Sequence, residues 1–244
     1  MSELIHVVMP MAGLGSRTKS FSQNPKPFIP LFGIPLFKFA LAGLPLDRCS
    51  KLTFVLNEKD RDFFDEAGKR LLEDFGPKHL AKTVVFTTTT SGQAETVDIA
   101  LSRSDLSNPL LIASCDTMVS KDFPSDSGEW DGLLGTFWSD SPAMSYVRLE
   151  DEVVVETAEK RVISNHASSG VYFFRRAADF REIYRESTFQ GESFVAPLYN
   201  RLISKQAKIG IWQHSSVVPL GTAEELIEFV ASAHPELIHA ISNT

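Results

Sequence analysis

Short apolar runs alternate with segments of helical spacing through the first half of the chain. The runs lie at 4–9, 51–56, 83–87 and 110–113, and the helical segments at 36–44, 59–75 and 94–101. A run of four to eight apolar residues is typical of a buried strand. Strands that alternate with helices favour a parallel sheet, because each crossover helix packs on a face of the sheet. The sequence therefore predicts an α/β fold.

The second half of the chain has a different pattern. Strands are expected at 132–137, 144–149, 153–157, 169–174 and 209–212, and helices at 180–186, 193–204 and 223–232. No linker or repeat separates this part from the first, so we expect one domain over residues 1–244. The predicted fold is a mostly parallel, Rossmann-like, doubly wound sheet with helices on both faces and a small β-rich part. The two halves, about 1–120 and 121–244, meet near residue 120.

Composition limits the class of protein. Apolar residues make up 43% of the 244 residues and charged residues 23%, as in ordinary globular proteins. The net charge of −7 argues against binding to nucleic acid. The apolar stretch 27–37 is broken by prolines and is too short to span a membrane, and the first 13 residues resemble no signal peptide. Cys49 and Cys115 form no disulfide framework. We therefore expect a reduced, cytoplasmic protein.

A glycine-rich loop directly follows the first expected strand and reads Met11-Ala12-Gly13-Leu14-Gly15-Ser16-Arg17. Glycines let backbone amides approach phosphate oxygens closely, and an arginine can add a bidentate contact. The loop differs from the dinucleotide-binding fingerprint, because Thr18 stands where the third glycine belongs, and no Gly-Lys-Ser/Thr of the ATPase loop follows. Taken alone, the glycine pair is explained equally well by a tight turn.

Two further charged residues are candidates for phosphate chemistry. Lys26 lies between Pro25 and Pro27, which stiffen the backbone and can hold the ammonium as a fixed point charge. Asp116 follows the fourth expected strand, where a carboxylate suits Mg²⁺ bound together with phosphate oxygens and water. Taken singly, Lys26 is better explained as a solvated lysine of a proline-rich segment, and the alternative for Asp116 is a turn-capping residue.

Together these elements, MAGLGSR…NPKPFIPLFGIPLF, resemble the signature of the sugar-phosphate nucleotidyltransferases, the nucleotide-sugar pyrophosphorylases. The detail of the two motifs is similar to small bacterial enzymes of capsule and surface-polysaccharide assembly. The resemblance implies a Mg²⁺-dependent enzyme that joins a nucleoside triphosphate to a sugar 1-phosphate or a similar small phosphate compound. In-line attack on the α-phosphate would give the nucleotide sugar and release pyrophosphate. Residues to about 120 would bind the nucleotide, and the remainder the other substrate.

The resemblance also implies roles for individual residues. Arg17 and Lys26 would be catalytic, and Asp116 would bind the metal. The nucleotide would be bound by Met11, Ala12, Gly13, Gly15, Ser16, Gly92 and Gln93. The second substrate would be bound by Glu156, Glu159, Lys160, Gly170 and Glu192. Simpler explanations stay open here: Ser91 as a helix cap before Gly92, and solvated strand faces or a helix cap for the later charges.

One departure from the family pattern keeps other functions open. Many relatives carry an aspartate, as a second metal ligand, where this chain has Pro219 in Pro219-Leu220-Gly221-Thr222. A regulatory homologue that binds nucleotide without catalysis is therefore an alternative, as is a cytidylyltransferase acting on a phospho-alcohol. A glycosyltransferase is disfavoured, because Cys115-Asp116-Thr117-Met118 lacks an Asp-x-Asp motif. The base, the acceptor and the choice between monomer and homo-oligomer are not determined.

Overall fold

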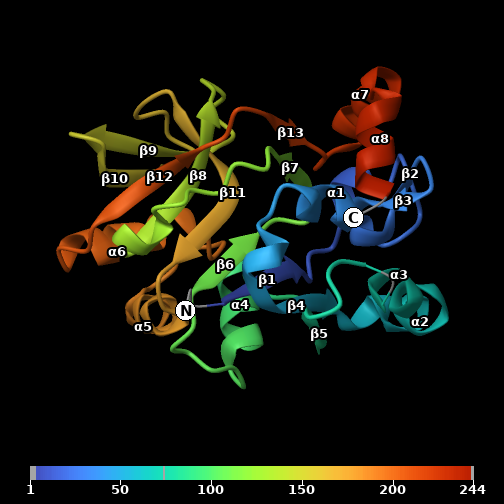
Figure 1. Ribbon diagram of the computed structural model, residues 1–244, viewed down its shortest axis with the longest axis horizontal. Coiled ribbons are helices and arrows are strands. Elements are labelled where there is room, and N and C mark those ends of the chain that lie inside the picture. Colours follow the sequence, from blue (N-terminus) through green and yellow to red (C-terminus); the bar gives the residue numbers. More distant parts are fainter. Residues whose placement is uncertain (1–3, 74, 243–244) are drawn as a thin grey trace.

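A nine-stranded sheet carries both halves of the chain in the computed structural model, which describes residues 4–73 and 75–242 (Figure 1). Its strands are β1 (Ile5–Met11), β4 (Cys49–Asn57), β5 (Ala81–Thr87), β6 (Leu110–Ala113), β8 (Gly132–Trp138), β9 (Ser145–Glu150), β10 (Val153–Glu159), β11 (His166–Phe174) and β12 (Ile209–Gln213). Two small sheets pair β2 (Pro30–Leu31) with β3 (Ile34–Pro35), and β7 (Thr117–Val119) with β13 (Val217–Pro219).

The first-half strands form the parallel part of the sheet. Their order is β6-β1-β4-β5, and every pairing among them is parallel. Alternate residues of β1 enter opposite faces: Val7 and Met9 pack in one core, and Val8 packs in another. A strand that is buried on both faces has to be apolar almost throughout. This explains why every residue from Ile5 to Met9 except His6 is apolar.

Strand β11 divides the sheet into two branches. One edge of β11 pairs with β8 along most of its length. The other edge pairs with β9 through His166 and Ala167, and with β6 through residues 171–174. Both branches are antiparallel to β11, and a β-bulge between Ser168 and Tyr172 marks the division. The second half of the chain is therefore built directly onto the parallel sheet.

Helices cover both faces of the sheet. Helices α1 (Leu36–Ala42), α2 (Arg61–Phe63) and α3 (Lys69–Glu73) pack on one face, and α4 (Gln93–Leu101), α5 (Ala177–Glu186) and α6 (Tyr199–Ser204) on the other. Helices α7 (Ala223–Ser232) and α8 (Pro235–Ser242) lie beside α1 and the β2–β3 hairpin, as Figure 1 shows. The predicted α/β fold class is confirmed. The antiparallel pairings of the large sheet are those of β11 with β6, β8 and β9, and of β9 with β10. Within the described ranges, no helix is long and apolar enough to cross a bilayer.

Two of the helices predicted from the sequence differ in detail. The segment expected as one helix over 59–75 contains a π-helical turn at Phe64–Gly68, between α2 and α3. Gly68 lies against Phe64 and Phe28, where an added Cβ would fall 3.0 Å and 3.2 Å from their rings. The helix expected at 193–204 begins later, with a 3₁₀ turn at Ala196–Leu198. Ser193 and its neighbours instead contact the start of α4, as described below.

His6 makes the stability of this sheet sensitive to acid. Its side chain is buried, and its Nε2 lies 2.8 Å from the Thr53 hydroxyl of β4. Burial, assisted by the charge of Lys51, lowers the pKa of His6 from 6.5 to about 4. Between these values the unfolded chain binds a proton that the native chain does not, so stability falls as the pH falls.

We therefore expect the free energy of unfolding to decrease by about 3 kcal/mol through His6 as the pH falls from 6.5 to 4. Urea unfolding across this range measures the slope. His6→Gln should flatten it, whereas His79→Gln, at an exposed histidine, should keep the wild-type slope. An unchanged slope in His6→Gln would show that other groups cause the acid sensitivity.

Candidate active site

A cavity of about 890 Å³ opens beyond the carboxyl ends of β1 and β6. Ligands of open α/β sheets bind at this edge, because the loops that follow parallel strands meet there. The structure brings most of the predicted site residues together in its walls: Met11, Ala12, Gly13, Gly15, Ser16, Arg17, Lys26, Gly92, Gln93, Asp116 and Glu192. These residues come from segments up to 181 positions apart in the chain (Met11 to Glu192), so the fold assembles the cavity from distant parts.

The glycine loop is held through its carbonyl oxygens. Asn57 Nδ2 donates to the Ala12 carbonyl at 2.7 Å, and Lys59 Nζ donates to the Leu14 carbonyl at 2.8 Å. Thr18 Oγ1 donates to the Gly15 carbonyl at 3.0 Å. Because these carbonyls already have donors, the backbone N–H groups are what the loop can offer to a ligand. Such a loop suits an anion, and the exposed guanidinium of Arg17 adds positive charge.

Gly15 allows the loop to approach the segment that carries Lys26. It adopts a left-handed conformation with φ of 66°, and an added Cβ would lie 3.2 Å from the Cβ of Lys26. Lys26 begins a 3₁₀ turn, Lys26–Phe28, which is anchored by the buried Pro27 and Phe28. The proline-flanked segment therefore holds Lys26 beside the glycine loop.

Lys26 and Asp116 form a short ion pair in the wall of the cavity. Their side chains are 12% and 21% exposed, so both are largely shielded from water. Lys26 Nζ also donates to the carbonyl of Gly221 at 3.2 Å. Three segments that are distant in sequence thus meet at one ammonium group.

Gly221 was not among the predicted site residues, although the sequence placed its turn, Pro219-Leu220-Gly221-Thr222, where many relatives carry a second metal ligand. Pairing of β13 with β7 brings it beside Asp116, and the Leu220 amide donates to the Asp116 backbone carbonyl at 2.8 Å. Glu225 Oε2 accepts from the amides of Gly221 at 2.7 Å and Thr222 at 2.9 Å. Thr222 and Glu225 form a capping box at the start of α7. The spacing Thr-x-x-Glu was the available sequence signal for this cap, but not for its proximity to Lys26.

Two carboxylates face the position that a side chain at Gly221 would occupy. An added Cβ there would fall 3.2 Å from Asp116 Oδ2, 3.4 Å from Glu225 Oε2 and 3.7 Å from Lys26 Nζ. Pro219 is exposed and pairs with Thr117, so it supplies no polar ligand. In the part of the chain that the structure describes, no three His, Cys, Asp or Glu residues form a metal-binding group. The residues present therefore fit a Mg²⁺ that binds one protein carboxylate and takes its other ligands from phosphate and water.

The start of α4 is joined to the segment around Ser193. The Ala94 amide donates to the Ser193 carbonyl at 2.9 Å, and the Ser193 amide donates to the Ser91 carbonyl at 3.0 Å. Gly92, not Ser91, is the N-cap residue, so the alternative that Ser91 caps the helix is wrong. Gly92 permits the close contact, because an added Cβ would lie 2.7 Å from the Ser193 backbone. Gly92 and Gln93 thereby face the same cavity as Glu192.

The remaining predicted residues lie at different distances from the cavity. The Gly170 carbonyl accepts from the amide of Ser114, a cavity residue, at 3.2 Å. Lys160 Nζ lies 4.9 Å from the ring centre of Phe194, which also lines the cavity. Glu159 accepts a short hydrogen bond from Ser145, and burial raises the pKa of its carboxyl group. Gly170 and Lys160 therefore contact residues that line the cavity, and Glu159 lies close enough to Glu192 for that carboxylate to contribute to its raised pKa, but none of the three is itself a lining residue.

Glu156 is the predicted residue that the structure does not bring to the cavity. It forms ion pairs with Arg161 at 2.6 Å and with Arg148 at 3.2 Å on β9 and the turn after β10. Hydrogen bonds from these guanidinium groups lower the pKa of the Glu156 carboxyl group. Its position indicates a surface ion pair between neighbouring strands.

No protein-family model and no curated protein matches the chain. Solved structures do match. The nucleoside-diphosphate-sugar pyrophosphorylase from Vibrio cholerae RC9 is 29% identical, and the match covers 93% of this chain and 100% of that chain with a TM-score of 0.79.

Two further solved structures share the fold at lower identity. The inositol-1-phosphate CTP transferase from T. maritima is 17% identical, with 99% of this chain and 96% of that chain covered and a TM-score of 0.74. The UDP-glucose pyrophosphorylase from Acinetobacter baumannii is 14% identical, with 98% of each chain covered and a TM-score of 0.76. The structural neighbours of this chain are thus nucleotide-sugar pyrophosphorylases and related sugar-phosphate nucleotidyltransferases, and the resemblance found in the sequence is confirmed.

Proposed function

We propose that the chain is a nucleotidyltransferase that couples a nucleoside triphosphate to a sugar 1-phosphate, or to a similar small phosphate compound, and releases pyrophosphate. The observation that carries this proposal is the position of Lys26. It lies beside a glycine loop that suits an anion, and it contacts Asp116 and the Gly221 carbonyl. The 29% identity to a pyrophosphorylase over almost the whole chain supports it independently.

The proposed reaction needs no nucleophile from the protein. An oxygen of the acceptor phosphate attacks the α-phosphorus, a new P–O bond forms, and the bond from the α-phosphorus to the bridging oxygen of the β-phosphate breaks. Pyrophosphate leaves with that electron pair. Catalysis in such a reaction comes from positioning and from stabilisation of charge. Arg17 and the loop amides would hold the β- and γ-phosphates, and Lys26 would stabilise charge at the α-phosphate.

Mg²⁺ is part of the proposal, with Asp116 as its protein ligand and Glu225 beside the same space. When bound, the ion would neutralise charge on the triphosphate oxygens. The chain's own contribution would be to orient Asp116: β7 follows it, β13 pairs with β7, and the Leu220 amide binds its backbone carbonyl.

The acceptor would bind in the half of the chain after residue 120. Glu192 and Phe194 line one side of the cavity, and Lys160, whose Nζ lies 4.9 Å from the Phe194 ring, would supply a positive charge for the acceptor phosphate. The half-buried carboxyl group of Glu159 can accept hydrogen bonds from acceptor hydroxyls. Gly170 contacts Ser114, which lines the cavity. The division into a nucleotide half and a substrate half is likewise a proposal.

The wider setting follows from the same resemblance. We place the reaction in nucleotide-sugar supply for surface polysaccharide, in the cytoplasm, with two small-molecule substrates. The net charge of −7 supports the absence of a nucleic-acid partner. Whether the chain forms a homo-oligomer is open to a measurement of its mass in solution.

Pyrophosphate release tests the proposal. Four nucleoside triphosphates, each with Mg²⁺, would be crossed with a panel of sugar 1-phosphates and small phospho-alcohols, including inositol phosphates. Release with one matched pair establishes the reaction and distinguishes a sugar acceptor from an alcohol. Tight nucleotide binding without release over the whole panel would favour the non-catalytic homologue that Pro219 suggests.

Lys26→Ala should decrease kcat by about 10²- to 10³-fold, the usual cost of losing one fixed group that stabilises transition-state charge. Lys19→Ala removes an exposed lysine from the same stretch of chain and should leave kcat unchanged. Steady-state kinetics with the matched substrate pair measures both, and thermal unfolding checks the fold. Near-normal turnover in Lys26→Ala would contradict the assignment.

Gly221→Ala tests the space between the two carboxylates. Its methyl group would stand 3.2 Å from Asp116 Oδ2, and the backbone of Gly221 is not left-handed, so alanine adds bulk without backbone strain. We expect the Mg²⁺ concentration for half-maximal turnover to rise about tenfold, which corresponds to about 1.4 kcal/mol. Gly128→Ala, where an added Cβ meets nothing within 4 Å, is the control. An unchanged Mg²⁺ requirement in Gly221→Ala would place the ion elsewhere.

A further inference from the structure

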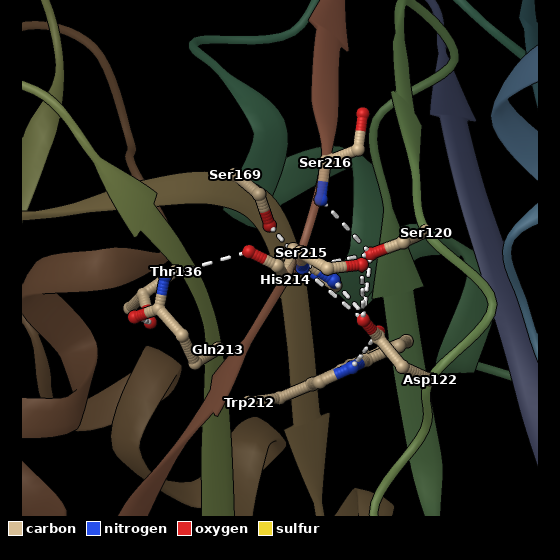
Figure 2. A network of polar contacts seen from close by, with 9 residues as sticks. All are labelled: Ser120, Asp122, Thr136, Ser169, Trp212, Gln213, His214, Ser215 and Ser216. Atoms are coloured by element: carbon tan, nitrogen blue, oxygen red, sulfur yellow. Dashed lines mark hydrogen bonds and ion pairs between the residues drawn. The ribbon is translucent and has the colours of Figure 1, made fainter.

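A chain of hydrogen bonds runs from the surface into the divided part of the sheet, and Figure 2 shows its outer section. Asp122 accepts from Trp212 Nε1 at 2.7 Å and lies 3.4 Å from His214 Nδ1. Its second oxygen accepts from the Ser120 hydroxyl at 2.6 Å and the Ser215 amide at 3.2 Å. On the other side of the imidazole, His214 Nε2 lies 3.0 Å from Ser169 Oγ. We refer to Asp122, His214 and Ser169 as the relay.

The chemistry of the relay fixes the direction of its hydrogen bonds. A carboxylate only accepts, so His214 Nδ1 is the donor toward Asp122. In a neutral imidazole Nε2 is then the acceptor, and the Ser169 hydroxyl donates to it. Burial lowers the pKa of His214, which favours this neutral form. Neither His214 nor Ser169 is accessible to solvent, so the relay orients groups instead of reacting with a substrate.

A glycine makes room for the relay. An added Cβ at Gly135 would lie 2.5 Å from Ser169 Oγ and 2.7 Å from His214 Nε2, so β8 tolerates only glycine at this point. Ser169 is thereby held from two sides, by the imidazole and by the backbone of β8. It lies in the bulge of β11, directly before Gly170.

Gly170, the residue after Ser169, connects the relay to the cavity through its backbone hydrogen bonds. Its amide donates to Ser168 Oγ at 3.2 Å. Its carbonyl accepts from both the amide of Ser114, at 3.2 Å, and the Ser114 hydroxyl, at 3.4 Å. An added Cβ at Gly170 would lie 2.7 Å from Ser114 Oγ, so the contact requires glycine here as well. The single hydroxyl proton of Ser114 is thus directed to Gly170.

The Ser114 hydroxyl can then only accept from its other neighbour, Gln93. Gln93 Nε2 lies 3.1 Å from Ser114 Oγ, at the first residue of α4 and in the wall of the cavity. A carboxamide has one end that donates and one that accepts. With Nε2 committed to Ser114, the orientation of Gln93 is determined, and Oε1 is the end left for a ligand.

We propose that Ser114 and Gly170, backed by the buried relay, orient Gln93 so that its carbonyl oxygen selects a ligand carrying an O–H or N–H donor at this point. The inference rests on the proposed function, because it names a specificity-determining residue of the same cavity. The donor belongs either to the base or ribose of the nucleotide or to a hydroxyl of the acceptor, since Gln93 lies where both halves of the chain meet. Ser114, Ser169 and His214 are positioning residues that act through Gln93.

A double-mutant cycle tests the link between Ser114 and Gln93. Gln93→Leu should raise the KM of one substrate about tenfold and leave its kcat within about twofold, because the lost contact binds ligand without entering the reaction. The substrate whose KM rises identifies the source of the donor. Ser114→Ala should raise the same KM about threefold, and should have no further effect in the Gln93→Leu background. Unchanged KM values for both substrates, or additive effects of the two changes, would overturn the proposal.

Ser169→Ala extends the test to the relay. It should raise the same KM by a smaller factor and should lose this effect in the Gln93→Leu background, whereas a general loss of structure would lower kcat and the thermal midpoint together. Ser102→Ala, at the far end of α4, is the matched control. If the wild-type chain releases no pyrophosphate, the proposed function fails separately, and calorimetric titration of the four nucleotides then decides. The acceptor panel would be titrated in the same way, and unchanged dissociation constants for every nucleotide and acceptor in Gln93→Leu would in that case overturn the inference.

Discussion

The ion pair between Lys26 and Asp116 determines how the cavity is built. Withdrawing a charge from water is costly unless an opposite charge and further hydrogen bonds replace the solvent. Asp116 supplies the opposite charge, and the Gly221 carbonyl supplies a further acceptor. To bring these groups together, the chain has to place the loop after β1, the end of β6 and the turn after β13 at one point. The glycine loop approaches Lys26 through Gly15, and the small β7–β13 sheet places the Gly221 turn beside Asp116. In the proposed reaction, the negative charge of the triphosphate would replace Asp116 as the partner of Lys26. The divalent cation would replace Lys26 as the partner of Asp116.

The branching of the sheet explains how the second half of the chain reaches the same site. In a parallel sheet, only the loops after the strands meet at the ligand-binding edge. Strand β11 runs antiparallel to β6, so its early residues, not its end, arrive at that edge. The bulge at 168–172 then turns the Gly170 carbonyl toward Ser114, two residues before Asp116. One strand thereby supplies core residues to the sheet and a hydrogen-bonded contact to the cavity.

The sequence predicted those parts of the site whose chemistry is local. The glycine loop, the proline-flanked Lys26 and the strand-end Asp116 can each be recognised from a few neighbouring residues. The strand pattern placed them at one edge of the sheet. His214 and the contact of Ser114 with Gly170 could not be found in this way, because their partners lie more than 40 positions away. The family motif drew attention to the turn of Gly221 but did not show its contact with Lys26. Glu156 shows the converse, since its charge suggested a ligand while Arg148 and Arg161 engage it on the surface. The helix start expected at Ser193 failed for the same reason: contacts with Ser91 and Ala94 outweigh its local preference.

The turn after β13 contacts Lys26 although Pro219 supplies no carboxylate. A proline in β13 supplies no carboxylate, but β13 is a short strand, and a proline is tolerated in such an edge position. The strand still pairs with β7 and still delivers Gly221 to Lys26. Glu225 brings a carboxylate to the far side of this turn, where it binds two backbone amides and faces the same space as Asp116. Because Mg²⁺ binds to nucleotides with few protein ligands, the proposed site would lack one contact at Pro219 and would still have Asp116 as a ligand. The glycine turn, which contacts Lys26 directly, is therefore more informative here than the neighbouring position occupied by Pro219.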